Sequence, residues 1–233
     1  MASKITINNV DITFLGHSGF IIEENNHKIV IDPFLTGNPL ATVKPESIKA
    51  DSLIITHAHS DHIGDSISIA KNNNIPITAT FELEKYIASN GAKANLVAIG
   101  SKQKLPFGNV VFRPAIHNNK PSDGIDIPLI LPSSVLLQLQ GLSIYHLGDT
   151  AINLDFKLIQ EVYKPDVAIV PIGGHYTMDI EEAVFAVAWL GVKYVIPVHY
   201  NTFSLIKADP LELKEKMKQA NLKAECIILD TAE

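Results

Sequence analysis

The sequence predicts a protein of the α/β class, in which strands and helices share a large apolar core. Three observations support this. Apolar, β-branched segments of strand length recur along the whole 233-residue chain, of which 46% is hydrophobic. In each half, strands come first and then alternate with helical patterns, which indicates parallel strands joined by helices. No linker separates the two halves, so we expect residues 1–233 to form a single domain built from two similar β-rich units.

The first half opens with strands and continues with alternating strands and helices. Its segments alternate apolar and polar residues or are continuously apolar, and turn residues such as Asn8-Asn9 separate them. Residues 35–51 form a long loop with proline and glycine, which is a candidate wall of an active site. We expect strands at 4–7, 11–15, 20–22, 28–31, 52–56, 75–80 and 94–99, and helices at 65–73 and 81–90.

The second half repeats this order. Asp179 with Glu182 three residues later has the spacing of a helix capping box, and Pro210 directly after Asp209 is typical of a helix start. Residues 118–128 carry prolines, glycine and charges and are expected to form a surface loop. We expect strands at 102–105, 109–114, 135–139, 143–147, 165–172, 192–198 and 224–229, and helices at 153–163, 179–190 and 210–220.

Composition narrows the classes of partner. The net charge is −6 and lysine and arginine form no cluster, which disfavours a nucleic-acid partner, because such a partner needs a basic face. The sequence has no run of about eighteen apolar residues and no basic-then-apolar start, so we expect neither a membrane span nor secretion. Cys226 is the single cysteine and cannot form an internal disulfide, which fits the cytoplasm. The partner we expect is a small-molecule substrate, although composition alone does not identify one, and a homo-oligomer is compatible with this composition.

The densest group of chemically active residues lies between Thr56 and Asp65, where a predicted strand turns into a helix. His57 and His59 project to the same side of an extended turn and can share one metal ion. Asp61 and His62 follow one step further on and suit a second ion. The alternative is a solvated loop whose histidines are coincidental, but four potential ligands in six residues favour a metal site.

The pattern His-x-His-x-Asp-His after an apolar strand resembles the signature of the metallo-β-lactamase superfamily. That resemblance implies a later histidine, an aspartate and another histidine, each at the end of a strand. His117, Asp149 and His199 occupy such positions. Asp149 in Gly148-Asp149-Thr150 has an alternative interpretation as the N-cap of helix 153–163, and the other matches favour the ligand.

Further motifs resemble a narrower subgroup of uncharacterised metal-dependent hydrolases, similar to L-ascorbate-6-phosphate lactonase and to N-acyl-phosphatidylethanolamine-hydrolysing phospholipase D. The resemblance covers nearly the whole chain and implies a four-layer αβ/βα sandwich. Such motifs identify fold and site better than substrate. They are residues 16–20 (GHSGF), 31–33 (IDP), 148–150 (GDT), 171–178 (PIGGHYTM) and 197–202 (PVHYNT).

The resemblance implies a dinuclear metal centre. His57, His59 and His117 would hold one ion, Asp61, His62 and His199 would hold the other, and Asp149 would bridge them. Imidazole and carboxylate ligands without thiolate favour zinc, with manganese, iron or nickel as alternatives. The implied function is a metal-dependent hydrolase, in which a metal-bound hydroxide cleaves a small phosphodiester, lactone or similar ester and Asp61 also accepts a proton.

Three other residues are candidates with open alternatives. Asp32 ends a strand and is expected to orient a ligand histidine, or else to cap a turn. His17, between two glycine-containing turns, lies beside the metal site or caps a backbone group. His175 polarises a substrate oxygen or holds a leaving group, or is packed between loops. The alternative function for the whole chain is a non-catalytic metal-binding sensor or assembly module, which a fully coordinated metal site would support.

Overall fold

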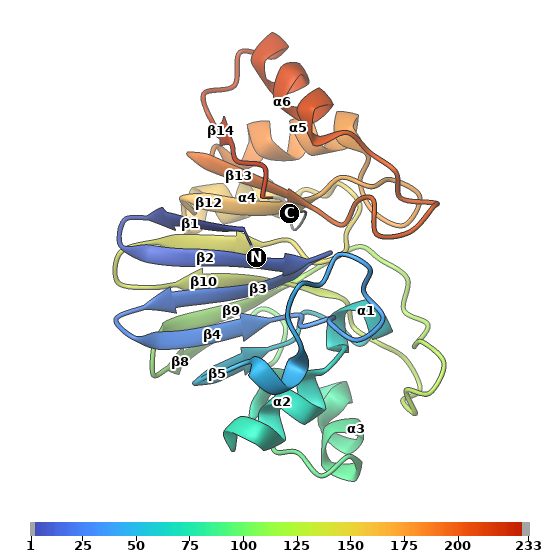
Figure 1. Ribbon diagram of the computed structural model, residues 1–233. Helices are drawn as coiled ribbons and strands as arrows, with labels where there is room; N and C mark the ends of the chain where they lie inside the picture. The colour runs from blue at the N-terminus through green and yellow to red at the C-terminus, as the bar shows by residue number, and fades with distance from the viewer. Residues whose placement is uncertain (1–2, 230–233) are drawn as a thin grey trace.

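The computed structural model describes residues 3–229, and over these residues two seven-stranded sheets face each other (Figure 1). The first sheet has its strands in sequence order, and the second runs in the reverse order from β14 to β8. The first contains β1 (Lys4–Ile7), β2 (Val10–Gly16), β3 (Gly19–Glu24), β4 (His27–Ile31), β5 (Ser52–Ile54), β6 (Ile77–Ala79) and β7 (Ala94–Leu96). The second contains β8 (Lys102–Leu105), β9 (Gly108–Pro114), β10 (Ser133–Gln138), β11 (Ser143–His146), β12 (Val167–Pro171), β13 (Tyr194–Val198) and β14 (Glu225–Cys226).

The two sheets have the same internal plan. Strands β1 to β4 pair antiparallel, and β4 to β7 pair parallel. In the second sheet β8 to β11 pair antiparallel, and β11 to β14 pair parallel. Parallel pairing needs a crossover, and helices mostly supply it. The two similar β-rich units expected from the sequence are therefore present.

Helices cover the outer face of each sheet (Figure 1). On the first sheet these are α2 (Ser66–Asn73) and α3 (Glu84–Ser89), with the short turns η1 (Pro45–Ser47), η2 (Phe81–Leu83) and α1 (Ser60–Ile63). On the second sheet they are α4 (Asp155–Val162), α5 (Ile180–Leu190) and α6 (Pro210–Gln219). The Asp179 carboxylate accepts a hydrogen bond from the Glu182 amide at the start of α5, as the capping-box spacing predicts.

Three apolar clusters hold the layers together. Val110 and Phe112 of β9 point between the sheets, while Val111 points outward to the helices, because side chains alternate along a strand. Both faces of the strands are thus buried. The fold class is the four-layer αβ/βα sandwich expected from the resemblance, with one apolar layer between the sheets and one under each set of helices.

Local boundaries differ from the sequence expectation at the central motif. Strand β5 ends at Ile54 rather than Thr56, and residues 60–63 form the helix α1 instead of an extended turn. Only the segment up to His59 is extended, with φ −79° and ψ 150° at that residue. Asp61 and His62 therefore lie on a helical turn. No helix among residues 3–229 is long and apolar enough to cross a membrane.

Candidate metal centre

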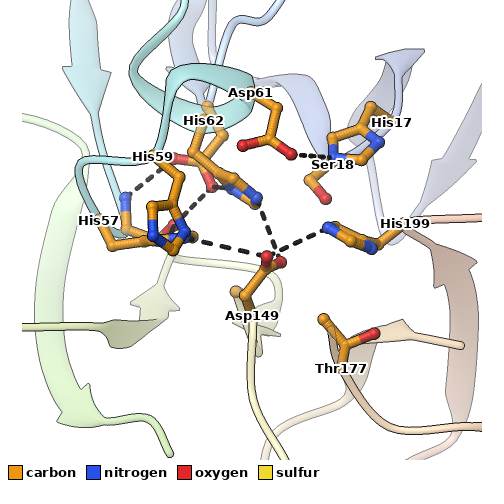
Figure 2. Close-up of polar contacts among 12 residues, drawn as sticks. His17, Ser18, His57, His59, Asp61, His62, Asp149, Thr177 and His199 are labelled. Carbon is orange, nitrogen blue, oxygen red and sulfur yellow. Dashed lines mark hydrogen bonds and ion pairs between the residues drawn. The ribbon is translucent and has the colours of Figure 1, made fainter. Parts of the chain in front are cut away.

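The predicted metal ligands come together at one edge of the sandwich, in the loops that follow β5, β9, β11 and β13 (Figure 2). Two groups of donors lie side by side there. In each group one ligand atom per residue lies within 4.8 Å of the others. The first group is His57, His59, His117 and Asp149, and the second is His17, Asp61, His62 and His199. We call them the first cluster and the second cluster.

In the first cluster the protons of the histidines point outward. His59 Nε2–H donates to the Lys120 carbonyl at 3.0 Å. Thr56 Oγ1 donates its only proton to Asp32 at 2.6 Å, so it accepts from His57 Nδ1–H at 3.0 Å. His57 Nε2 and His59 Nδ1 therefore face each other at 2.9 Å with lone pairs and no proton between them. His117 Nε2 lies 3.1 Å from the same His59 nitrogen.

Converging lone pairs at these distances repel unless a cation lies among them. A divalent ion that accepts imidazole nitrogen and carboxylate oxygen removes this repulsion, and zinc takes such ligands. The donor set of the first cluster therefore fits a metal ion.

Asp32 holds one ligand of each cluster. It is fully buried and accepts hydrogen bonds from the Thr56 amide, the Thr56 hydroxyl and His62 Nδ1–H, the last at 2.8 Å. The bond to His62 leaves its Nε2 facing inward without a hydrogen-bond partner among the described residues. Asp32 thus orients His62 directly and His57 through Thr56.

Asp149 lies between the clusters (Figure 2). Its Oδ1 is 3.1 Å from His62 Nε2, and its Oδ2 is 3.1 Å from His199 Nε2 and 3.5 Å from His117 Nε2. Helix α4 begins after Leu154, so Asp149 is not its N-cap. The carboxylate is buried and reaches ligands of both groups, which is the geometry that a bridging ligand requires.

The two clusters differ in their electrostatics. Burial lowers the pKa of His57 and His59, and it lowers the pKa of His117 to about 4. Burial also lowers the pKa of His62, but the carboxylates of Asp149 and Asp32 outweigh it and raise this pKa well above its ordinary value. In the metal-free protein the imidazoles of the first cluster are therefore neutral at pH 7, while the carboxylates of Asp149 and Asp32 favour the protonated form of His62.

His17 lies beside the candidate metal site, and its ring faces side chains rather than capping a backbone group. Its ring is 1% exposed, its Nδ1 lies 2.8 Å from Thr202 Oγ1 and its Nε2 lies 3.2 Å from Asp61 Oδ2. The other acceptor near the Thr202 hydroxyl, the Tyr200 carbonyl oxygen, is more distant at 3.4 Å. The Thr202 hydroxyl therefore donates its hydrogen bond to His17 Nδ1. With that tautomer His17 Nε2–H points at Asp61 and orients the carboxylate.

Several of these residues have a strained backbone. His17, Asp32, His175 and His199 have φ between 45° and 58°, the left-handed region that side chains other than glycine rarely adopt. Such conformations cost on the order of 1 kcal/mol or more each and gather at functional sites. Three of the four, His17, Asp32 and His199, have side chains directed at the clusters. The strained backbone is therefore found where side chains are placed at the candidate metal site.

The structure does not bring His175 to the donors. Its side chain is exposed, and its ring contacts the Tyr176 ring at a centroid distance of 4.4 Å. Among the described residues, Tyr176 rather than His175 lines the cavity over the clusters. The residue is therefore neither packed between loops nor positioned over the site.

A cavity of about 440 Å³ lies over both clusters. Besides the donors His59, Asp61, His117, Asp149 and His199, its lining consists of Phe34, Ser60, Asn118, Ser122, Tyr176 and Phe203. None of these six was predicted, and neither were Thr56 and Thr202. Thr56 could have been suspected because it directly precedes His57. The aromatic residues come from separate loops, and nothing local in the sequence marks them.

Comparisons with known proteins place the chain in a family. Residues 11–199 match the β-lactamase superfamily domain. A UPF0173 metal-dependent hydrolase of Archaeoglobus fulgidus is 41% identical over 224 residues, covering 95% of this chain and 96% of the relative. One of Bacillus cereus is 40% identical over 210 residues, covering 89% and 92%. The solved structure of a metallo hydrolase from Ignicoccus hospitalis is similar with a TM-score of 0.86 at 36% identity, covering 96% of both chains.

The chain therefore belongs to the metallo-β-lactamase superfamily, as its sequence predicts. The fold class is confirmed, and the names of the relatives agree with the predicted enzyme class of metal-dependent hydrolase. The narrower similarity to L-ascorbate-6-phosphate lactonase stays a prediction, as do the identity of the metal and the assignment of each ligand.

Proposed function

We propose that this protein is a metal-dependent hydrolase that uses a two-ion centre to cleave a small phosphodiester, a lactone or a similar ester. The observation that carries the proposal is the pair of facing lone pairs on His57 and His59, 2.9 Å apart beneath an open cavity. Such a pair needs a cation, and the cavity gives a substrate access to it. The relatives named metal-dependent hydrolases support the same reaction class.

The ligand assignment follows the two clusters. His57, His59 and His117 would hold one ion, Asp61, His62 and His199 the other, and Asp149 would contact both. When bound, such ions acidify water near neutral pH and neutralise the negative charge that develops on the substrate oxygen. Zinc suits these nitrogen and oxygen donors, and manganese, iron and nickel are alternatives.

The chain's own residues then orient the reaction. Burial raises the pKa of Asp61, but the hydrogen bond from His17 and the charge on His62 outweigh it, so this pKa is lowered and the carboxylate stays ionised. An ionised Asp61 on the cavity wall accepts a hydrogen bond from an attacking water and directs it. Its low basicity makes full proton transfer to it less favourable than the sequence-based expectation assumed. Orientation of the water is therefore the role we assign to Asp61.

The alternative, a non-catalytic metal sensor, receives no support from the cavity. A sensor or structural site surrounds its ion completely, whereas a catalytic site keeps an open position. Here the side chains of Asp61, His117 and Asp149 all reach the cavity surface.

The proposal is tested by hydrolysis of bis(p-nitrophenyl) phosphate by metal-replete protein, with Asp61→Asn as the comparison. We expect Asp61→Asn to fold normally, as judged by circular dichroism, and to lose activity by about a hundredfold, the scale of the loss when a reacting group is misplaced. Equal rates in the two proteins would remove the role of Asp61. Absence of hydrolysis for phosphodiesters, lactones and carboxylic esters alike, in protein shown to contain metal, would contradict the proposed function.

A further inference from the structure

The cavity over the two clusters has two chemically different walls. Phe34 and Phe203, whose rings contact each other, form one wall, which we call the aromatic wall, and Ser60, Asn118 and Ser122 form the other, which we call the polar wall. The aromatic wall lies beside the second cluster, because the rings of Phe34 and Phe203 contact the His17 ring at centroid distances of 5.8 and 5.4 Å. The polar wall follows His59 and His117 in the chain and so lies beside the first cluster.

The aromatic wall is held in place before any ligand binds. The Phe34 and Phe203 rings are 6.3 Å apart at a tilt of 34°. Asp65 accepts hydrogen bonds from the backbone amides of the two residues after Phe34, at 2.9 and 2.8 Å. Gly64 allows this loop to approach closely, since a Cβ there would come within 2.7 Å of the Phe34 Cα. Thr202, the residue before Phe203, is held by its contact with His17.

The polar wall is held equally firmly. His59 donates to the Lys120 carbonyl, and the Ser60 amide donates to Ser122 Oγ at 3.1 Å. The Lys120 amide in turn donates to the Asn118 side chain at 3.0 Å. Beyond this wall a second hollow, of about 460 Å³, shares four lining residues with the first and adds Lys120, Pro121 and Asp123. The polar side of the cavity therefore continues outward, while the aromatic side closes over His17.

We propose that the substrate is an amphipathic ester whose apolar group lies against Phe34 and Phe203 and whose polar group lies against Asn118 and Ser122. The proposal rests on the hydrolase function proposed above and specifies its substrate class. An anionic or hydroxylated group against the aromatic wall would lose hydration without gaining a partner, whereas an apolar group gains from burial there. The cavity volume of about 440 Å³ lies within the usual range for small-molecule pockets.

The aromatic wall is tested by the dependence of binding on chain length. Methyl-, propyl- and pentylphosphonate are titrated calorimetrically into metal-loaded protein, so the readout needs no turnover. In parallel, kcat/KM is measured for p-nitrophenyl acetate, butyrate and hexanoate. We expect the association constant of the phosphonates and the kcat/KM of the esters to rise roughly two- to fourfold for each added methylene. A fourfold rise corresponds to about 0.8 kcal/mol for each fully buried methylene.

Phe203→Ala and Phe34→Ala should flatten that dependence. Phe34→Leu replaces Phe34→Ala if the latter fails to fold, and it should reduce the dependence. The matched control is Phe185→Ala, which removes a 60% exposed phenylalanine from α5, on the outer face of the second sheet. This control should keep the full chain-length dependence.

The polar wall is tested with two esters that share an acyl group, 1-monobutyrin and propyl butyrate. We expect a preference for monobutyrin, and Asn118→Ala should reduce it by roughly fivefold, the scale of one net hydrogen bond. A preference for propyl butyrate in the unmodified protein would overturn the orientation.

The outcomes separate this inference from the function on which it rests. Binding that is independent of chain length, or a dependence that survives in both phenylalanine variants, would overturn the inference. Ester hydrolysis without any chain-length dependence would also overturn it, although the hydrolase function would stand. A chain-length dependence of phosphonate binding with no hydrolysis of any ester would support the apolar subsite while contradicting the hydrolase function.

Discussion

The first and second clusters contain the same kinds of ligand atom but are held in different ways. In the first cluster the outward protons of His57 and His59 go to a threonine hydroxyl and to a carbonyl of a surface loop. In the second, His62 donates to the buried carboxylate of Asp32, and His17 holds Asp61. A neutral acceptor leaves an imidazole ready to bind a cation, whereas a carboxylate raises its affinity for a proton. Metal and proton therefore compete mainly at the second cluster.

The surroundings differ in the same direction. Aromatic rings cover the second cluster, while hydroxyl and amide side chains line the cavity beside the first. An apolar cover lowers the local dielectric constant and strengthens the electrostatic interactions between the charged groups beneath it. A substrate that spans both clusters thus meets two environments, and the difference between them fixes its direction.

The largest expected effect comes from removing the residue that the clusters share. Asp149→Asn replaces a carboxylate that reaches His62, His199 and His117 with a neutral amide. We expect the metal content to fall at both clusters and turnover to fall on the order of a thousandfold, the upper range for a lost electrostatic contact in a transition state. Metal analysis by mass spectrometry and the phosphodiester rate measure this.

The control for Asp149→Asn is Asp126→Asn, which changes the same chemical group at an exposed position. It should alter neither metal content nor rate. Retention of a full metal complement by Asp149→Asn would show that the clusters bind their ions independently and would contradict the proposed bridging role of Asp149.

A smaller effect is expected from Asp32→Asn, because this residue acts through the ligands. It orients His62 directly and His57 through Thr56, so the affinity of both clusters should fall by roughly ten- to a hundredfold, the usual cost of losing such a partner. Competition with a fluorescent chelator measures the affinity for each ion. A loss of affinity for only one of the two ions would contradict the proposal that Asp32 positions ligands of both clusters.

The sequence predicted the fold, and it indicated candidate ligands at strand ends that the structure brings close together, because both depend on local patterns. His57 and His59 follow one strand at a fixed spacing, and His117, Asp149 and His199 each follow another, so strand order alone brings them to one edge. The α1 helix was missed, because four residues are too few to give a helical period. The ligand assignment itself awaits the metal measurements described above.

The rest of the site depends on contacts between distant segments. Thr202 meets His17 across 185 positions of sequence, and Phe34 meets Phe203 only because both loops close over His17. Neither pairing leaves a local pattern. His175 shows the opposite error, since a histidine after a strand and two glycines has the sequence context of a site residue but its side chain is exposed.

The smallest expected effect is the number of protons released when each metal ion binds, and it measures the difference between the clusters most directly. The pKa of His62 is raised above 6.5, so at pH 7 the metal-free protein holds a proton that an ion must displace. The pKa of His117 is about 4, and burial also lowers the pKa of His57 and His59, so the first cluster holds no proton at that pH. We expect one ion to bind with release of about one proton and the other with almost none.

Calorimetric titration in two buffers of different ionisation enthalpy separates the two events. As pH rises toward the raised pKa of His62, fewer protons compete with the metal ion, so the affinity of the second cluster for metal should increase and then level off. The affinity of the first cluster should stay nearly constant and fall only as pH approaches the value of about 4 for His117. In Asp32→Asn the proton release should shrink, because His62 loses one of the two carboxylates that raise its pKa. Equal proton release for both ions would mean that the protein treats the clusters alike, despite their different partners.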